Sequence, residues 1–207
     1  GGFAASADKV TITNSYNYGS VSSPDGARKD DFVTSFSDGS TVTNSFFISE
    51  CDFEGNGATK MSSTEFADGT VFAALRSAED GEVWRQYKND AYPTFAAKTG
   101  TDAPSPMHVA TLHYSETDSV VIAYTEGTAK SLPTEDKSGN PITGWTTSAD
   151  GTGDAITEIP TTAATDLKLY PKAKTFEPNA EGYYEIASAD DLYKFAAIVN
   201  NGTAVGS

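Results

Sequence analysis

The chain has 207 residues, of which 29 are acidic and 14 basic, so its formal net charge at pH 7 is −15. A surface of that charge repels phosphate backbones and anionic lipid headgroups, which argues against nucleic-acid and membrane partners. One cysteine and two histidines are too few for an internal disulfide or a structural zinc site. No apolar run approaches the roughly 18 residues that a membrane span needs. The composition is typical of secreted β proteins, although an acidic β protein of any compartment is an alternative.

The N-terminal segment, residues 1–57, repeats one phrase at an offset of 30 residues. TITNSY, which starts at Thr11, aligns without a gap on TVTNSF, which starts at Thr41. The turn sequences SSPDG and GNG separate these β-forming runs, and this pattern predicts parallel solenoid rungs with Asn14 and Asn44 at equivalent corners. The alternative is that the two copies form ordinary β-hairpins whose sequences happen to be similar. Because two repeats alone do not bury their faces, further rungs or a cap are expected beside them.

Residues 58–98 are expected to form that cap, beginning with a helix. Ser62 and Glu65 have the spacing of a capping box, in which two side chains satisfy free N–H groups at a helix start. Apolar residues at helical spacing follow as far as Leu75. Gly69 interrupts the pattern and weakens the prediction of one continuous helix.

An aromatic cluster follows the predicted helix and is the candidate binding site. It consists of Trp84, Tyr87, Tyr92 and Phe95. Packing against the end of the solenoid is the favoured interpretation. The alternative is an exposed platform on which Trp84, Tyr87 and Tyr92 stack against sugar rings.

The first repeat resembles the GLUG motif of bacterial surface proteins, in which a glycine pair, a β-strand and an Asn-Ser-Tyr-Asn-x-Gly-x-Val corner follow one another. The matching residues are Gly1, Gly2, Phe3, Asn14, Tyr16, Asn17, Gly19 and Val21. The second copy departs from the motif, since Asp30 and Asp31 replace the glycines, as a terminal rung would. STEFADGTVFAALRS and the aromatic cluster are similar to the closing segment of such arrays in gut and rumen bacteria. The resemblance implies right-handed parallel β-helix rungs.

Residues 99–106 are expected to be a linker, because Pro104 and Pro106 punctuate them. A different unit, residues 107–174, then begins. Side chains of alternating character in HVATLHY and SVVIAYT predict the two strands of a hairpin, and DLKLYPK predicts a closing strand. Trp145 lies between them in a long polar stretch.

This second unit resembles the internalin B-type repeat, also called the Listeria–Bacteroides repeat. The residues that follow the order of that family are Gly127, Pro133, Gly144, Trp145, Leu169, Tyr170 and Lys172. Ile142, Pro171 and Ala173 depart from it. The resemblance implies a small β-grasp-like module. Trp145 is then expected to be a core residue, with Leu112, Ile122 and Leu169 as its neighbours.

Residues 175–207 predict a short strand and a second helix. Ser188 and Asp191 form a second candidate capping box, and apolar residues follow at the spacing of a core-facing helix: Leu192, Phe195, Ala196 and Val199. The segment resembles the opening that precedes GLUG arrays, so we expect the chain to be a piece of a longer protein. Unfinished surfaces at its two ends predict head-to-tail self-association, through Phe3, Val10 and Ile12 on one side and Ile186, Leu192 or Phe195 on the other.

No catalytic constellation emerges from the sequence, and the chain is not expected to be an enzyme. The acidic residues are scattered through turns, and no Ser-His-Asp order, phosphate loop or nucleotide fingerprint is present. Asp150 and Asp154 flank a glycine-rich turn that makes calcium a candidate ligand, although a tight turn is favoured because further carboxylates are missing.

The expected fold is therefore mostly β with two short helices, combining partial right-handed parallel β-helix rungs with a β-grasp-like module. The expected function is that of a secreted or cell-surface bacterial repeat protein, an adhesin stalk, spacer or interaction module. Its partner would be a protein or glycan at a cell surface. The alternative is a carbohydrate-binding accessory region of a glycan-degrading system, and a β-helical lyase is a third class that depends on fold analogy alone.

Overall fold

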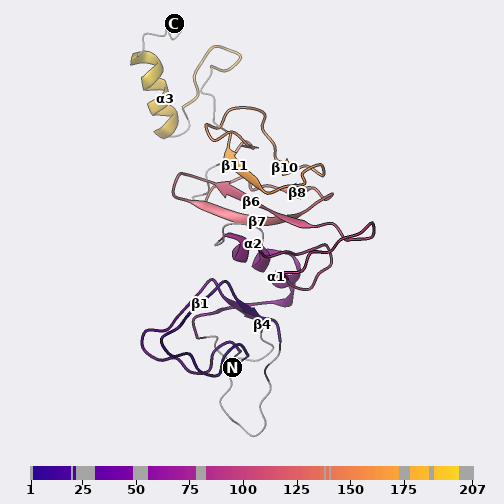
Figure 1. Ribbon diagram of the computed structural model, residues 1–207. Helices are drawn as coiled ribbons and strands as arrows, with labels where there is room; N and C mark the ends of the chain where they lie inside the picture. The colour runs from indigo at the N-terminus through magenta and orange to yellow at the C-terminus, as the bar shows by residue number, and fades with distance from the viewer. Residues whose placement is uncertain are drawn as a thin grey trace.

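The computed structural model describes residues 2–19, 21, 31–48, 56–77, 83–137, 139, 141–172, 178–186 and 189–200. Its described part is mostly β, with short strands and three helices (Figure 1). The sequence predicted two helices, and this number is wrong because the first of them is divided in two. Cys51 lies outside the described residues.

The two copies of the repeated phrase lie side by side in parallel. The strands of this part are β1 (Thr11–Thr13), β2 (Tyr16–Asn17), β3 (Thr41–Thr43), β4 (Phe46–Ile48) and β5 (Thr59–Met61). β1 pairs with β3, and β2 pairs with β4, which in turn pairs with β5. Thr11 lies opposite Thr41 and Tyr16 opposite Phe46, so the pairing keeps the 30-residue offset of the sequence. The hairpin alternative is wrong, because hairpins pair antiparallel.

We call residues 2–17 the first rung and residues 31–48 the second rung. Parallel bridges between Ala4 and Val33 and between Ala7 and Phe36 extend their pairing beyond the strands. The interior of the pair holds a small apolar cluster: Ala7, Phe32, Val33 and Phe47 are buried in it, with Ile12 and Val42 packed against them.

An asparagine corner joins the two rungs to the helices. Asn14 and Asn44 have φ angles of 49° and 43°, in the left-handed region that asparagine tolerates better than most residues. The Asn44 Nδ2 donates to the Asn14 Oδ1 at 2.8 Å and to the Ala74 carbonyl oxygen at 2.9 Å. The repeated asparagine therefore links consecutive turns of the chain and ties the second rung to the following helix.

The cap contains two helices, α1 (Ser63–Ala67) and α2 (Thr70–Ser77). The predicted capping box is confirmed, since Ser62 accepts from the Glu65 backbone and Glu65 accepts from the Ser62 backbone. Gly69 divides the helices with a φ of +90°, a conformation that favours glycine. A Cβ there would lie 2.6 Å from the Ala123 Cβ, so the break also lets the chain approach the neighbouring sheet closely.

The second unit is a four-stranded sheet with the order β7-β6-β11-β9. Its strands are β6 (Met107–His113), β7 (Ser119–Thr125), β9 (Trp145–Thr146) and β11 (Leu167–Pro171), and β8 (Lys130–Ser131) pairs with β10 (Glu158–Ile159) beside it. The predicted hairpin is confirmed as β6 and β7, in a register that places Val109 opposite Ala123. β11 joins parallel to β6, with Leu167 opposite Ala110.

Trp145 is fully buried in the core of this sheet, as the sequence predicted. It shares one apolar cluster with Leu112 and Leu169, which are also fully buried, and Ile122 packs against that cluster. The indole Nε1 donates to the Pro133 carbonyl oxygen at 2.8 Å, so the polar end of the side chain is satisfied.

One apolar cluster spans the rungs, the cap and the sheet. Helices α1 and α2 lie between the parallel strands and β6–β7 (Figure 1). The buried members of this cluster, which we call the shared core, are Phe46, Phe66, Val71, Phe72, Ala73, Leu75, Trp84, Val109 and Ala123. The expected linker also takes part in the fold, since Pro106 bridges to Tyr87 and the Met107 N–H donates to the Gln86 carbonyl oxygen at 2.8 Å.

The C-terminal helix, α3 (Ala189–Asn200), is present as predicted, but its apolar stripe is not core-facing. Leu192 is 54% exposed and Val199 44%, while Phe195 is half-buried with its ring 5.6 Å from that of Tyr184. Ser188 of the second predicted capping box lies outside the described residues.

Trp145→Ala should lower the free energy of unfolding by about 3–5 kcal/mol, because it opens a large cavity and removes the bond to Pro133. Urea unfolding measures the change. Trp145→Phe, which fills most of the cavity, should cost clearly less. An unfolding curve of Trp145→Ala that matches the wild type would contradict the assignment of this residue to the core.

Asn44→Asp should cost about 2 kcal/mol, because a carboxylate would replace the Nδ2 donor opposite two oxygen acceptors. Asn14→Asp is the matched control one rung away. It keeps the Oδ1 that accepts from Asn44, so its melting temperature should stay close to that of the wild type. Equal losses of stability in the two variants would contradict the assigned direction of the hydrogen bond, from the Asn44 Nδ2 to the Asn14 Oδ1.

Candidate binding surface

No helix among the described residues is long and apolar enough to cross a membrane.

An aromatic groove lies where the first rung meets residues 83–98. The groove has a volume of about 430 Å³. It is lined by Phe3, Asn14, Ser15, Tyr16, Trp84, Thr94 and Phe95. Because none of these side chains is charged, the groove suits an uncharged or apolar ligand surface.

The aromatic rings of the groove differ in their exposure. Phe95 is 61% exposed and its ring lies 4.2 Å from that of Trp84, which is only 7% exposed. The Tyr16 ring lies 5.4 Å from Trp84 on the other side. Phe3 is 48% exposed and stacks on Phe32 of the second rung at 4.7 Å. Trp84 therefore forms the floor, while Phe3 and Phe95 offer the accessible faces.

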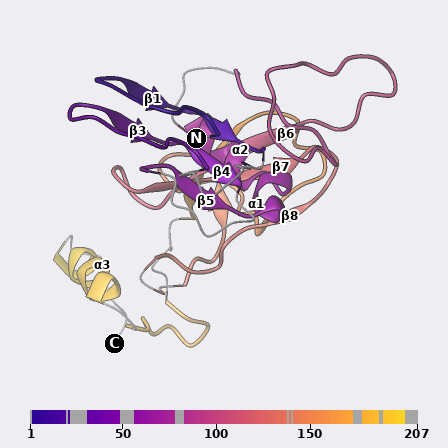
Figure 2. The ribbon, with the colours of Figure 1, turned by 90° about the horizontal axis from the view of Figure 1, so that it is seen from below.

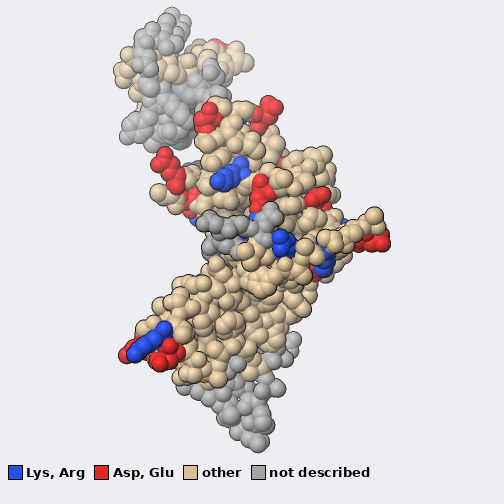
Figure 3. Space-filling view, in the orientation of Figure 1, with Lys and Arg blue, Asp and Glu red and all other residues tan. Residues whose placement is uncertain are grey.

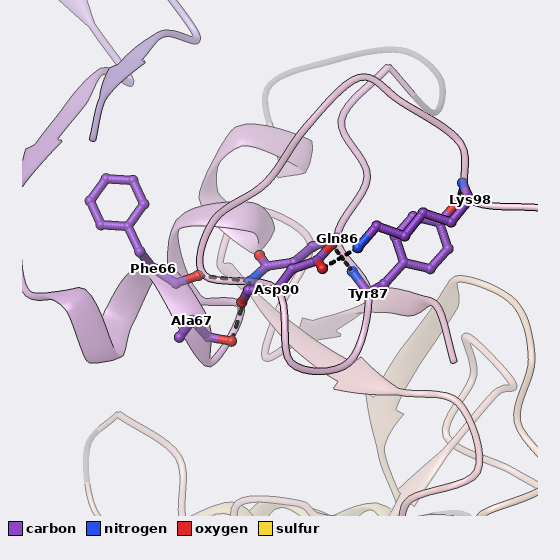
Figure 4. A network of polar contacts seen from close by, with 6 residues as sticks. All are labelled: Phe66, Ala67, Gln86, Tyr87, Asp90 and Lys98. Carbon is purple, nitrogen blue, oxygen red and sulfur yellow. Dashed lines mark hydrogen bonds and ion pairs between the residues drawn. The ribbon is translucent and has the colours of Figure 1, made fainter. Parts of the chain in front are cut away.

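A polar network holds residues 83–98 against α1 (Figure 4). The Gln86 side chain is 1% exposed, and its Nε2 donates to the carbonyl oxygens of Phe66 at 2.8 Å and Ala67 at 3.2 Å. Asp90 accepts from the Tyr87 N–H at 3.1 Å and pairs with Lys98. Because carbonyl groups at a helix end lack intrahelical partners, the Gln86 amide both caps α1 and positions the neighbouring Trp84.

The three predicted binding residues do not form one platform. Trp84 and Tyr87 are each 7% exposed. Trp84 packs in the shared core with Phe46 of the second rung, whereas Tyr87 is buried without belonging to that core. The Tyr87 hydroxyl accepts from the Lys98 N–H at 2.8 Å, and Tyr87 does not line the groove. Tyr92 is 39% exposed and contacts Tyr18, at 4.7 Å between ring centroids.

The structure adds Phe3 and Phe95 to the candidate surface. The sequence interpretation had placed Phe95 in the aromatic cluster without giving it a binding role. Phe95 differs from Trp84 in its exposure to solvent, which depends on the path of the loop and could not be predicted from the sequence.

Burial and the neighbouring Tyr92 raise the pKa of Tyr16 to about 12. The hydroxyl donates to the Pro93 carbonyl oxygen. Tyr16 therefore stays neutral at physiological pH and links the first rung to the loop that carries Phe95.

A second cleft, of about 890 Å³, lies between α2 and the sheet. Arg76 and Asp166 form an ion pair there, and the Asp166 Oδ1 also accepts from the Val109 N–H at 2.9 Å. The Arg76 side chain is 8% exposed. Since both groups are held by protein partners, we interpret this cleft as a structural junction between the cap and the sheet.

Asp150 lies in a tight turn, which the Gly151 N–H closes on the Ser148 carbonyl oxygen at 3.0 Å, and Asp154 follows this turn. The Asp150 carboxylate accepts from the Thr152 N–H at 2.9 Å and from its hydroxyl at 2.6 Å, and these bonds lower its pKa. Gly151 and Gly153 both have positive φ angles. Within the described residues, no three His, Cys, Asp or Glu side chains lie together as metal ligands. The tight-turn interpretation is confirmed for Asp150, and calcium binding stays a prediction.

On the face drawn in Figure 3, acidic residues are scattered over the sheet, whereas on the rungs they lie at one tip beside basic atoms. Comparison of the chain with protein families, curated proteins and solved structures found no match. The two family resemblances therefore stay interpretations of the sequence.

Raising the pH above 10 should destabilise the protein partly through Tyr16. The pKa of a tyrosine is near 10 in the unfolded chain, whereas that of Tyr16 in the fold is about 12. The contribution of the neutral hydroxyl to the free energy of unfolding is therefore complete below pH 10 and is lost as the pH rises toward 12. Urea unfolding at neutral pH and above pH 10 should show a smaller pH-dependent loss for Tyr16→Phe. Identical losses in the wild type and the variant would contradict the burial of this hydroxyl.

Proposed function

We propose that the chain is a stiff segment of a secreted or cell-surface bacterial repeat protein, where it works as an adhesin stalk or spacer. Its rungs would belong to a GLUG-type β-helix, and its four-stranded sheet to an internalin B-type, β-grasp-like module. The parallel stacking of the two copies in their 30-residue register supports the first part. The buried Trp145 and the order of the strands support the second.

The shared core is the observation that carries the spacer proposal. α2 is buried on both sides, since Phe46 of the second rung and Val109 and Ala123 of the sheet belong to the same cluster as Phe72. The asparagine corner and the Arg76–Asp166 pair flank this core with directional bonds. A junction without an apolar gap resists bending, and stiffness is what a spacer requires.

Unfolding experiments test this proposal. If the shared core joins the two β parts, the wild type should unfold in one transition, with equal calorimetric and van 't Hoff enthalpies. Trp145→Ala, in the core of the sheet, and Phe72→Ala, in the shared core, should both shift that one transition. Two transitions, with Trp145→Ala moving only one of them, would show independent modules joined by a hinge and would overturn the proposal.

We do not propose an enzyme. The acidic and basic groups that meet in clefts of the described residues already contact partners: Asp166 pairs with Arg76, and His108, 4.0 Å from Asp166, lies 3.1 Å from Glu126. Product release from pectin, alginate or xylan by the purified chain would contradict this part of the proposal.

Carbohydrate binding is the second candidate function, and the exposed aromatic rings of the groove favour it. Phe95 is the residue to test, because it is the most exposed ring of the groove. On a glycan array, binding should disappear in Phe95→Ala while the melting temperature stays unchanged. Tyr87→Ala is an unsuitable test of binding, since Tyr87 is buried and its loss should destabilise the fold. An array without any signal for the wild type would reject this candidate.

A further inference from the structure

The outer edge of the first rung has backbone groups with which no described strand pairs. Among the described residues, β1 pairs only with β3 and β2 only with β4. Figure 2 shows β1 on the outer side of the stack, with β3 beside it. The Thr41 N–H donates to the Val10 carbonyl oxygen, and the Phe46 N–H to that of Ser15. Because alternate residues of a strand direct their groups to opposite sides, Thr11 and Tyr16 direct theirs away from the second rung.

The amide of Asn14 gives this edge a direction. Its Oδ1 accepts from the Asn44 Nδ2 at 2.8 Å, while its own Nδ2 has no acceptor among the described residues. A further asparagine at the same corner would accept from that Nδ2 with its Oδ1, and so continue the ladder by one step.

The aromatic groove lies along the same edge. Ser15 and Tyr16 belong both to the edge and to the groove, and Phe3 lines its other side. Within the stack, the Phe3 ring lies on the Phe32 ring, and Tyr16 is in register with Phe46. An incoming strand with an aromatic residue after its Asn-Ser pair would place that residue in register with Tyr16, beside the groove.

We propose that this edge binds an extended protein segment with the sequence Thr-x-Thr-Asn-Ser-aromatic, as a parallel strand in the register of the second rung. The pairing already present between the rungs supplies the geometry. Backbone bonds to Thr11 and Tyr16 provide affinity, and the Asn14 amide and the groove provide specificity. The inference is independent of the spacer proposal, since the edge would bind such a segment whatever the chain does as a whole.

A second copy of the chain fits this edge less well. On the far side of the second rung, β5 already pairs with β4, and the Ala74 carbonyl oxygen of α2 lies against the asparagine corner, so the first rung of another copy cannot pair with β4 there. If the first rungs of two copies paired with each other, a twofold axis would relate them and their strands would be antiparallel. In that arrangement the asparagine amides would not stack, so the ladder would not continue. The edge therefore requires a separate segment that carries its own corner.

Titration of the full chain with a synthetic peptide tests the proposal. The peptide has the sequence of residues 2–17, and its matched control carries leucine at the position of Asn14. Calorimetry should detect binding of the first peptide and at least roughly tenfold weaker binding of the second, which lacks one buried hydrogen bond. No binding of the first peptide at millimolar concentration, or equal binding of the two, would overturn the proposal.

Two protein variants locate the peptide. Asn14→Asp removes the Nδ2 donor but keeps the acceptor for Asn44, so it should weaken binding about tenfold with an unchanged melting temperature. Thr11→Pro removes one outward N–H from an edge strand, where proline is tolerated, and should also weaken binding. Unchanged binding in both variants would overturn the proposal. So would dimers of the wild type that Asn14→Asp abolishes, since the occupant would then be a second copy.

Discussion

The burial of α2 on two sides is the contact on which the rest of this molecule depends. Two stacked rungs have too little interior to be stable alone, and a four-stranded sheet with one covered face leaves the other face wet. α1 and α2 cover both surfaces with the same apolar residues, among them Phe66, Val71 and Phe72. Parts that resemble separate modules in the sequence therefore share one core.

Polar contacts around this core set the relative positions of its parts. Apolar packing is non-directional, so it holds surfaces together without fixing their register. The asparagine corner aligns the rungs with each other and with Ala74, and Asp166 holds both Arg76 of α2 and the Val109 backbone of the sheet. Gln86 does the same for the loop that carries Trp84.

The aromatic groove is a consequence of this arrangement. Residues 83–98 cross from the cap to the sheet beside the first rung, so the rings of both segments meet there. Rings that face α1 and α2 are buried, while Phe3 and Phe95 on the outer side are exposed. The groove therefore lies beside the edge of β1 and β2 that no described strand covers, and a ligand of either would contact the other.

Local patterns in the sequence determined the elements of this protein, because they depend on neighbours along the chain. The repeated phrase predicted the equivalent corners at Asn14 and Asn44, the Ser62–Glu65 spacing predicted a helix start, and alternation predicted the β6–β7 hairpin. Trp145 could be assigned to the core because an indole of its size is rarely left in water.

Only the tertiary structure decided which aromatic residues are buried and how the parts join. Trp84 and Phe95 belong to the same aromatic cluster of the sequence, yet one is 7% and the other 61% exposed, because exposure depends on contacts with distant segments. Gly69 indicated a weak point in the predicted helix, but the close approach of Ala123 at this position could not be read from the sequence. Burial and junctions are properties of residues brought together from far apart in the chain, so the site could be predicted only in part.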